Sequence, residues 1–179
     1  SLSKIVKISC TMNNSSTFED DNIIGGNITD KAILKFIKKN NLSYPKIGEI
    51  PFNSKDKYSV TTIQDKERVN LIKGAPEVIL NYCRSYYTDT LKKERLTVND
   101  VLKINKFLKE ECSKGNRIIL LATNTNMEMS NFNNSCLVGF LLLKDEIREN
   151  VKESIKLVKE ASIDVIMLTG DNKETAVSI

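Results

Sequence analysis

Lysine and glycine stand together where an expected strand gives way to an expected helix. In NLIKGAPEVIL, residues 70–80, Lys73 and Gly74 follow an apolar pair, and Pro76 comes two residues after the glycine. A lysine ammonium is a compact charge suited to phosphate, and glycine lets a backbone approach a ligand closely. The same pattern also fits a surface lysine before a tight strand-to-helix turn, and the pattern alone favours this second interpretation.

Two other positions carry side chains that could contact a nucleotide. Phe52 precedes a polar loop that contains Lys57, and Arg117 stands at the head of an expected strand. An aromatic ring can stack on a base while cations meet phosphates. The ordinary alternatives are a buried loop aromatic for Phe52 and a solvated strand-end charge for Arg117, and each is favoured when the residue is considered alone.

A third candidate is the tripeptide Thr169, Gly170 and Asp171, which follows an expected strand over 164–168. Ligands of open α/β sheets gather beyond the carboxyl ends of parallel strands, where the next helix offers its N-terminus to phosphate. This placement is more specific than the others. The alternative is an aspartate that caps a helix and binds nothing.

Composition excludes several kinds of site. The chain has no histidine, which excludes a histidine general base, a Ser-His triad and histidine-ligated metal. The net charge of +4 is spread along the chain, so we expect no nucleic-acid partner. We also expect no metal site, because no CxxC pair occurs among the cysteines, which are more typical of buried thiols in a reducing compartment. They are Cys10, Cys83, Cys112 and Cys136.

The first 135 residues predict one α+β domain. Alternation of Val6, Ile8 and Cys10 predicts a strand over 4–10, and Thr29 is a suitable N-cap for a helix. The other expected elements are a loop over 11–22, a largely irregular stretch over 40–54, a hairpin of strands 57–63 and 68–73, a helix from Pro76, a polar stretch after it, a helix from the Thr97–Asp100 capping box to Gly115, and a strand over 118–122.

The remaining residues, 136–179, predict a different kind of structure. The apolar run 136–143, an amphipathic stretch over 148–161 and a second apolar run over 164–168 form a strand-helix-strand pattern. This pattern is typical of a βαβ unit in a parallel sheet, here incomplete. We therefore expect a domain boundary between residues 135 and 136. We expect either poor order beyond residue 140 or a second copy of the chain that covers the open edge of the incomplete sheet, which would give a homodimer.

Taken in order, these segments resemble a P-type ATPase of the calcium-pump-like class. LIKGAPEVIL is similar to the KGAPE motif, and MLTGDNKETAVSI to the TGDxxxTA motif. IPFNSKDKYSV, GNITDKAIL, NRIILLA and LLLKDEIRENVKESI are similar to four weaker family segments. The resemblance covers nearly the whole chain and implies an antiparallel nucleotide-binding domain with flanking helices, followed by a partial haloacid-dehalogenase-like phosphorylation domain.

The resemblance implies a role for each matching residue. Phe52 would stack on adenine, Lys73 and Gly74 would line the nucleotide pocket, and Arg117 would approach the phosphates. The other implied nucleotide-site residues are Thr29, Asp30, Lys57, Asp145 and Arg148, and the phosphorylation-domain motif is Thr169, Gly170 and Asp171. We expect Lys73→Ala to weaken nucleotide binding without harming the fold, since a strand-end lysine in an open pocket has little packing to lose.

Some family features are absent from these 179 residues. DKTGT, whose aspartate accepts the phosphoryl group, and the magnesium-binding GDGxND segment do not occur, and Glu146 stands where the hinge usually has proline. We therefore expect the chain to bind ATP and ADP without phosphoryl transfer. Mg²⁺ would act in the full-length protein, where this cytoplasmic domain would cooperate with phosphorylation, actuator and membrane domains. Two alternatives remain open, a non-catalytic interaction module and a fragment of a haloacid-dehalogenase-type phosphatase.

Overall fold

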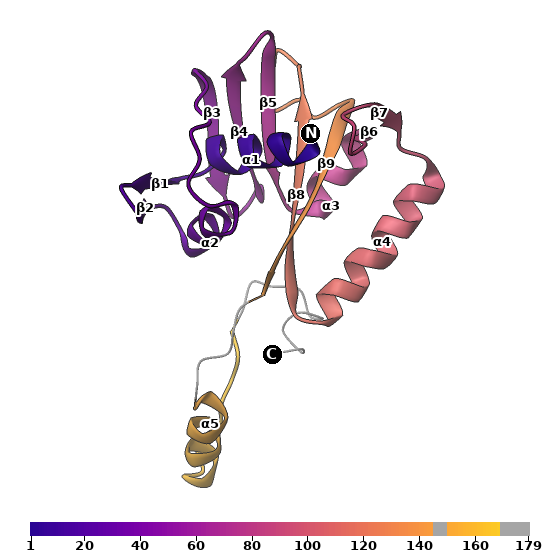
Figure 1. Ribbon diagram of the computed structural model, residues 1–179. Helices are drawn as coiled ribbons and strands as arrows, with labels where there is room; N and C mark the ends of the chain where they lie inside the picture. Colours follow the sequence, from indigo (N-terminus) through magenta and orange to yellow (C-terminus); the bar gives the residue numbers. More distant parts are fainter. Residues whose placement is uncertain (145–149, 169–179) are drawn as a thin grey trace.

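A seven-stranded sheet, with strand order β3-β4-β5-β8-β9-β6-β7, is the centre of the protein (Figure 1). The computed structural model describes residues 1–144 and 150–168. Neighbouring strands of the sheet are antiparallel except for β6 and β9, so the predicted α+β fold with a mostly antiparallel sheet is confirmed. The elements are α1 (Leu2–Met12), β1 (Ser16–Glu19), β2 (Asn22–Gly25), α2 (Ile28–Ile37), β3 (Lys46–Asn53), β4 (Tyr58–Gln64), β5 (Arg68–Gly74), α3 (Pro76–Ile79), a 3₁₀ turn η1 (Leu80–Tyr82), β6 (Cys83–Tyr87), β7 (Lys93–Arg95), α4 (Val98–Ser113), β8 (Asn116–Asn124), β9 (Ser135–Lys144) and α5 (Val151–Glu160).

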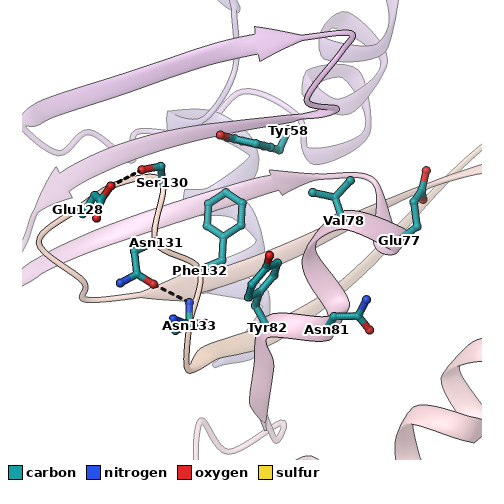
Figure 2. A pocket seen from close by; sticks show the side chains of 10 residues that line it. All are labelled: Tyr58, Glu77, Val78, Asn81, Tyr82, Glu128, Ser130, Asn131, Phe132 and Asn133. Carbon is teal, nitrogen blue, oxygen red and sulfur yellow. Dashed lines mark hydrogen bonds between the residues drawn. The ribbon is translucent and has the colours of Figure 1, made fainter.

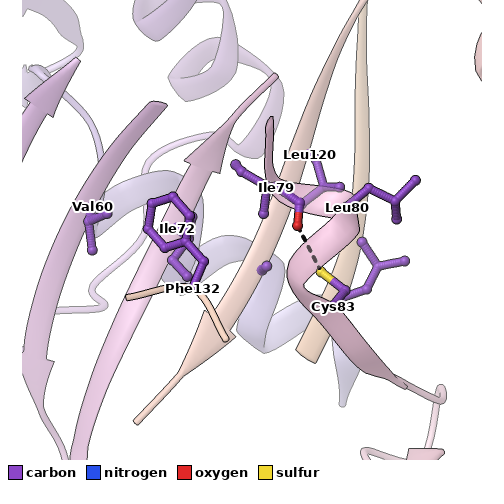
Figure 3. Packing of buried hydrophobic residues seen from close by; sticks show 9 residues of the cluster. Val60, Ile72, Ile79, Leu80, Cys83, Leu120 and Phe132 are labelled. Atoms are coloured by element: carbon purple, nitrogen blue, oxygen red, sulfur yellow. Dashed lines mark hydrogen bonds between the residues drawn. The ribbon is translucent and has the colours of Figure 1, made fainter. Parts of the chain in front are cut away.

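The two faces of the sheet carry separate apolar cores. On one face, Ile72 and Leu120 pack with Ile79 of α3 and with Phe132, and residues of α4 lie against this cluster (Figure 3). On the other face, Leu121 packs with side chains of α1 and α2. Successive residues of a strand point to opposite faces. Lys73 follows Ile72 and therefore belongs to the face that α1 and α2 cover.

The segment expected as a strand over 4–10 is instead helix α1, which crosses the sheet (Figure 1). The alternation of Val6, Ile8 and Cys10 has the period of a strand, and the strand that it predicted is wrong. Leu2, Ile5, Val6 and Cys10 recur at helical spacing and all pack into the core beneath α1. A helix is favoured here because it can bury its whole apolar stripe against the face of the sheet.

Three stretches expected to be irregular contain strands. Residues 11–22 include β1 and part of the β1–β2 hairpin. Residues 40–54, expected as loop with short extended pieces, contain the eight-residue β3, and the polar stretch after α3 contains β6 and β7. β3 lies at the sheet edge and has two register shifts, which is where a strand tolerates a proline such as Pro51. Pairing with neighbouring strands stabilises these strands, and their own sequence pattern is too weak to predict them.

Several local predictions are confirmed. β4 and β5 form the expected hairpin, Pro76 is the first residue of α3, and Thr97 and Asp100 form a complete capping box at α4. Gly115 ends the α4 segment with a φ of 79°. Thr29, however, does not cap α2. The cap is Asn27, whose side chain accepts a hydrogen bond from the Asp30 N–H at 2.8 Å.

The strand expected to open a separate βαβ unit belongs to the main sheet. β9 pairs antiparallel with β8 from Asn116↔Lys144 to Thr123↔Cys136, and its first residues pair parallel with β6. Residues 151–160 form the expected helix α5, but residues 164–168 are exposed and form no strand. The predicted βαβ unit is therefore wrong over this part of the chain. The expected homodimer depended on the open edge of that unit and stays a prediction. The boundary expected between residues 135 and 136 also stays a prediction, although β9, which begins at Ser135, pairs within the main sheet.

Candidate functional site

Lys73 is buried against Asp30, which lies 43 residues earlier in the chain. The Lys73 Nζ is 2.5 Å from Asp30 Oδ1, and the two side chains are 7% and 6% exposed. β5 supplies the lysine, and the N-terminal turn of α2 supplies the aspartate. The expectation of an open, surface-exposed Lys73 is therefore wrong, because helices cover this face of the sheet.

The Asp30 carboxylate is held on both oxygens. Oδ1 accepts from Lys73, while Oδ2 accepts from the Ser15 N–H at 3.0 Å and from the Ser15 hydroxyl. Burial alone would raise the pKa of Asp30, but the charge of Lys73 and these hydrogen bonds outweigh burial and hold the pKa below its ordinary value of 3.8. The Asp30 carboxylate is therefore ionised at neutral pH.

Three consecutive residues after α1, Asn13, Asn14 and Ser15, connect this ion pair to the rest of the domain; we call them the Asn13–Ser15 clamp. Asn13 donates to the carbonyls of Leu71 (2.8 Å) and Ser59 (3.1 Å), which lie on β5 and β4. Asn14 donates to the carbonyls of Cys10 and Asp30, both at 3.1 Å. The clamp could not be predicted from the sequence, since a short run of Asn and Ser also fits an ordinary polar loop.

Gly74 has a close neighbour that explains the glycine without a ligand. A Cβ at this position would lie 2.5 Å from the Lys57 carbonyl oxygen and 2.8 Å from the Tyr58 Cα. Gly74 pairs with Tyr58, and the following Ala75 N–H donates to the same Lys57 carbonyl at 2.9 Å. The glycine thus lets β5 end close against the start of β4.

Phe52 and Lys57 flank the turn between β3 and β4. Phe52 is 55% exposed, so the alternative of a buried loop aromatic is wrong. Lys57, also exposed, has its Nζ 3.2 Å from Glu77 Oε1 at the start of α3. β4 separates β3 from β5, so the strands of Phe52 and Lys73 are about 10 Å apart.

Arg117 lies near the start of β8, where it pairs with Leu143. Lys73 pairs with Leu121 on the same strand. Because 117 and 121 are four residues apart, they lie on the same face, about 13 Å apart along the strand. Thr29 is half-buried beside Asp30. Five further predicted residues, Asp145, Arg148, Thr169, Gly170 and Asp171, lie outside the described residues.

A cavity lies on the opposite face of the sheet (Figure 2). It has a volume of about 680 Å³, and Tyr58, Tyr82 and Phe132 form its aromatic wall. Glu77 and Glu128 also line it, and no lysine or arginine does among the residues that the structure describes. Two carboxylates without a lining cation disfavour a triphosphate, so this cavity does not fit the predicted nucleotide site.

Residues 1–144 and 150–168 contain no cluster of three or more His, Cys, Asp or Glu side chains arranged to hold a metal ion. Within the same residues, no helix has the length and apolar content needed to cross a bilayer. The α1–α2 face carries the cations Lys73 and Arg117, which are well separated along the sheet, and the paired Asp30 carboxylate, while the exposed ring of Phe52 lies at the nearby edge. This set suits an anionic ligand that carries a flat ring.

Comparison with known proteins decides the family. The family model of the P-type ATPase cytoplasmic domain N matches residues 1–154. The chain belongs to this family. The matched range includes β9, in agreement with its place in the main sheet of domain N.

Relatives of this P-type ATPase domain include pumps named for different ions. The chain is 33% identical over 184 residues to calcium-transporting ATPase 1 of Saccharomyces cerevisiae, covering 93% of the chain and 19% of that protein. It is 32% identical over 181 residues to the sodium/potassium-transporting ATPase subunit alpha-4 of Homo sapiens, covering 86% and 17%. It is 29% identical over 181 residues to calcium-transporting ATPase 1 of Lactococcus lactis, covering 93% and 20%. The chain thus spans about a fifth of the length of these relatives.

Proposed function

We propose that this domain N binds ATP and ADP on the sheet face covered by α1 and α2, at the ends of β3 and β5. The observation that carries the proposal is the buried Lys73. Its ammonium has three N–H donors, and Asp30 Oδ1 is its one hydrogen-bond acceptor among the described residues. A buried donor without an acceptor is costly, so a nucleotide oxygen or nitrogen is a suitable partner.

The positions of the side chains support the proposed roles. Phe52, exposed at the end of β3, stacks on adenine. Lys73 donates to the nucleotide and Asp30 holds Lys73, while Arg117 meets the phosphates farther along β8. Lys57 would have to leave Glu77 to take part, and an exposed ion pair of this kind costs little to break.

The remaining predicted residues belong to the full-length protein. We propose that Asp145 and Arg148 act at the hinge, and that Thr169, Gly170 and Asp171 assist an aspartate of the phosphorylation domain. Mg²⁺ would compensate phosphate charge there. In this proposal, ATP held by the described domain drives cation translocation by a membrane-embedded transporter, with this domain on the cytoplasmic side.

An NMR titration with ATP tests the nucleotide site. We expect amide shifts near residues 52 and 73 and a Kd on the order of 0.1 to 1 mM. Phe52→Ala should lose most of the affinity. Phe36→Ala is the matched control, since Phe36 is 72% exposed on α2. No shift near either residue at about ten times that Kd would overturn the proposal.

We further propose calcium as the transported ion. Calcium-transporting ATPases from yeast and bacteria are among the relatives, and the sodium/potassium-transporting subunit has a similar identity. The test is ATP hydrolysis by the full-length protein that contains this domain. Stimulation by Ca²⁺ is expected, and stimulation by Na⁺ and K⁺ without a response to Ca²⁺ would contradict the proposal.

A further inference from the structure

The number of nucleotide contacts that Lys73 can make depends on how Asp30 is held. A carboxylate has two oxygens and about four acceptor sites, so an unrestrained Asp30 could turn and take two of the three Lys73 N–H donors. In the structure it takes one, through Oδ1. The second oxygen points toward the Asn13–Ser15 clamp.

Ser15 is the residue that occupies this second oxygen. Its N–H donates to Oδ2 at 3.0 Å, and its hydroxyl donates to the same oxygen. Asn27 Nδ2 is more distant, at 3.5 Å. Two donors on Oδ2 fix the rotation of the carboxylate and leave Oδ1 alone to face Lys73.

Hydrogen bonds also fix the backbone around Ser15 and the backbone around Asp30. Asn14 joins the clamp to the Asp30 carbonyl, and Asn13 joins it to the carbonyls of β4 and β5. The N-terminal turn of α2 and the end of β5 are therefore kept at a set separation. Ser15 itself is exposed, so its side chain contributes little to the apolar core.

We propose that Ser15 is a positioning residue of the nucleotide site, which restrains Asp30 so that the Lys73 ammonium keeps N–H donors for the nucleotide. This inference rests on the proposed nucleotide binding. It assigns Asp30 the role of orienting Lys73, because Oδ1 accepts from Lys73 while Ser15 already places two donors on Oδ2. Ser15 acts on the ligand through Asp30 and Lys73.

Ser15→Ala in the 179-residue chain tests the inference. The variant keeps the backbone N–H and loses the hydroxyl, so Oδ2 regains acceptor capacity and competes for Lys73. We expect ATP and ADP to bind about three- to tenfold more weakly. Ser15→Thr keeps a hydroxyl and should restore binding. Thr17→Ala is the control, since Thr17 is exposed on β1 two residues away.

A second measurement separates positioning from a general loss of structure. The ¹H–¹⁵N signal of the Lys73 ammonium should shift in Ser15→Ala without nucleotide, while the melting temperature stays close to that of Thr17→Ala. An unchanged Lys73 signal together with unchanged ATP affinity would overturn the inference. If Ser15→Ala does not fold, Ser15→Gly is measured in the same way, and unfolding of both variants would show a structural role and also overturn it. Absence of ATP binding by the unsubstituted chain would instead refute the proposed function.

Discussion

At the scale of residues, burial gives Lys73 a structural role. A strand-end lysine on the surface would be free to bind phosphate at little cost to the fold, whereas the observed lysine neutralises a buried carboxylate. Removing one partner of such a pair leaves the other charge buried and uncompensated. The same residue therefore serves stability and, in the proposed function, the ligand.

Lys73→Ala should accordingly destabilise the domain. We expect the free energy of unfolding to fall by about 3 kcal/mol, because the Asp30 carboxylate loses its countercharge. Urea denaturation at neutral pH measures this difference. Lys57→Ala is the control. It removes an exposed lysine from an exposed ion pair and should cost about 0.5 kcal/mol or less. Equal effects of the two substitutions would show that the Lys73 pair is not buried in solution.

Asp30 should make the stability of the domain depend on pH in the acid range. Its folded-state pKa lies below the ordinary value of 3.8, so the ionised carboxylate stabilises the fold above that pH. This contribution declines as the pH falls below about 3.8 and is lost below the folded-state pKa. The difference in unfolding free energy between the unsubstituted chain and Asp30→Asn should therefore be constant from about pH 7 to 5 and shrink below 3.8.

The control for this titration is Asp89→Asn, which removes one negative charge from an exposed position. Its stability profile should run parallel to that of the unsubstituted chain. A difference for Asp30→Asn that stays constant down to about pH 2 would contradict an ionised Asp30.

At the scale of elements, the junction of β4 and β5 decides which residue position 74 accepts. A methyl group on Gly74 would press on the backbone of Lys57 and Tyr58, which belongs to the neighbouring strand. Backbone atoms cannot move aside without disturbing the pairing of the hairpin. Overpacking of this kind costs about 1–3 kcal/mol.

Gly74→Ala should thus lower the free energy of unfolding by about 2 kcal/mol. Gly48→Ala is the matched control on β3. Its added Cβ would meet Met129 Sδ at 2.7 Å, and a thioether side chain can rotate away. Thermal denaturation of both variants compares them directly. If Gly48→Ala is the more damaging substitution, the Gly74 contact is not the restrictive one.

At the scale of the whole molecule, we expect β9 to decide where the folded domain ends. It lies between β8 and β6 in the sheet and contributes Val138 and Leu137 to the cores on the two faces. Removing it would expose both cores and leave β6 and β7 without their connection to the rest of the sheet.

Truncation tests this. A chain of residues 1–144 should fold cooperatively and keep ATP affinity within about twofold of the 179-residue chain, a difference of less than 0.5 kcal/mol. A chain of residues 1–135 should fail to fold. Circular dichroism and ATP titration distinguish the outcomes. A folded, ATP-binding 1–135 chain would show that the boundary predicted from the sequence was adequate.

The sequence by itself determined the features that depend on neighbouring residues. Local hydrogen bonds define the Thr97–Asp100 capping box, Pro76 suits the first position of a helix, and the β4–β5 hairpin has a short polar turn. The family motif around Lys73 could also be recognised in the sequence, because its residues are consecutive. Each of these signals lies within a few residues of the chain.

Tertiary structure decided the features that need distant partners. Residues 2–12 form a helix whose apolar side chains pack against one face of the sheet. β9 pairs antiparallel with β8 within the same sheet. Lys73 pairs in the interior with Asp30, 43 positions earlier, and Ser15 in turn donates to that carboxylate. A residue's own neighbours in sequence carry no record of such a partner, since burial and charge pairing depend on distance in space.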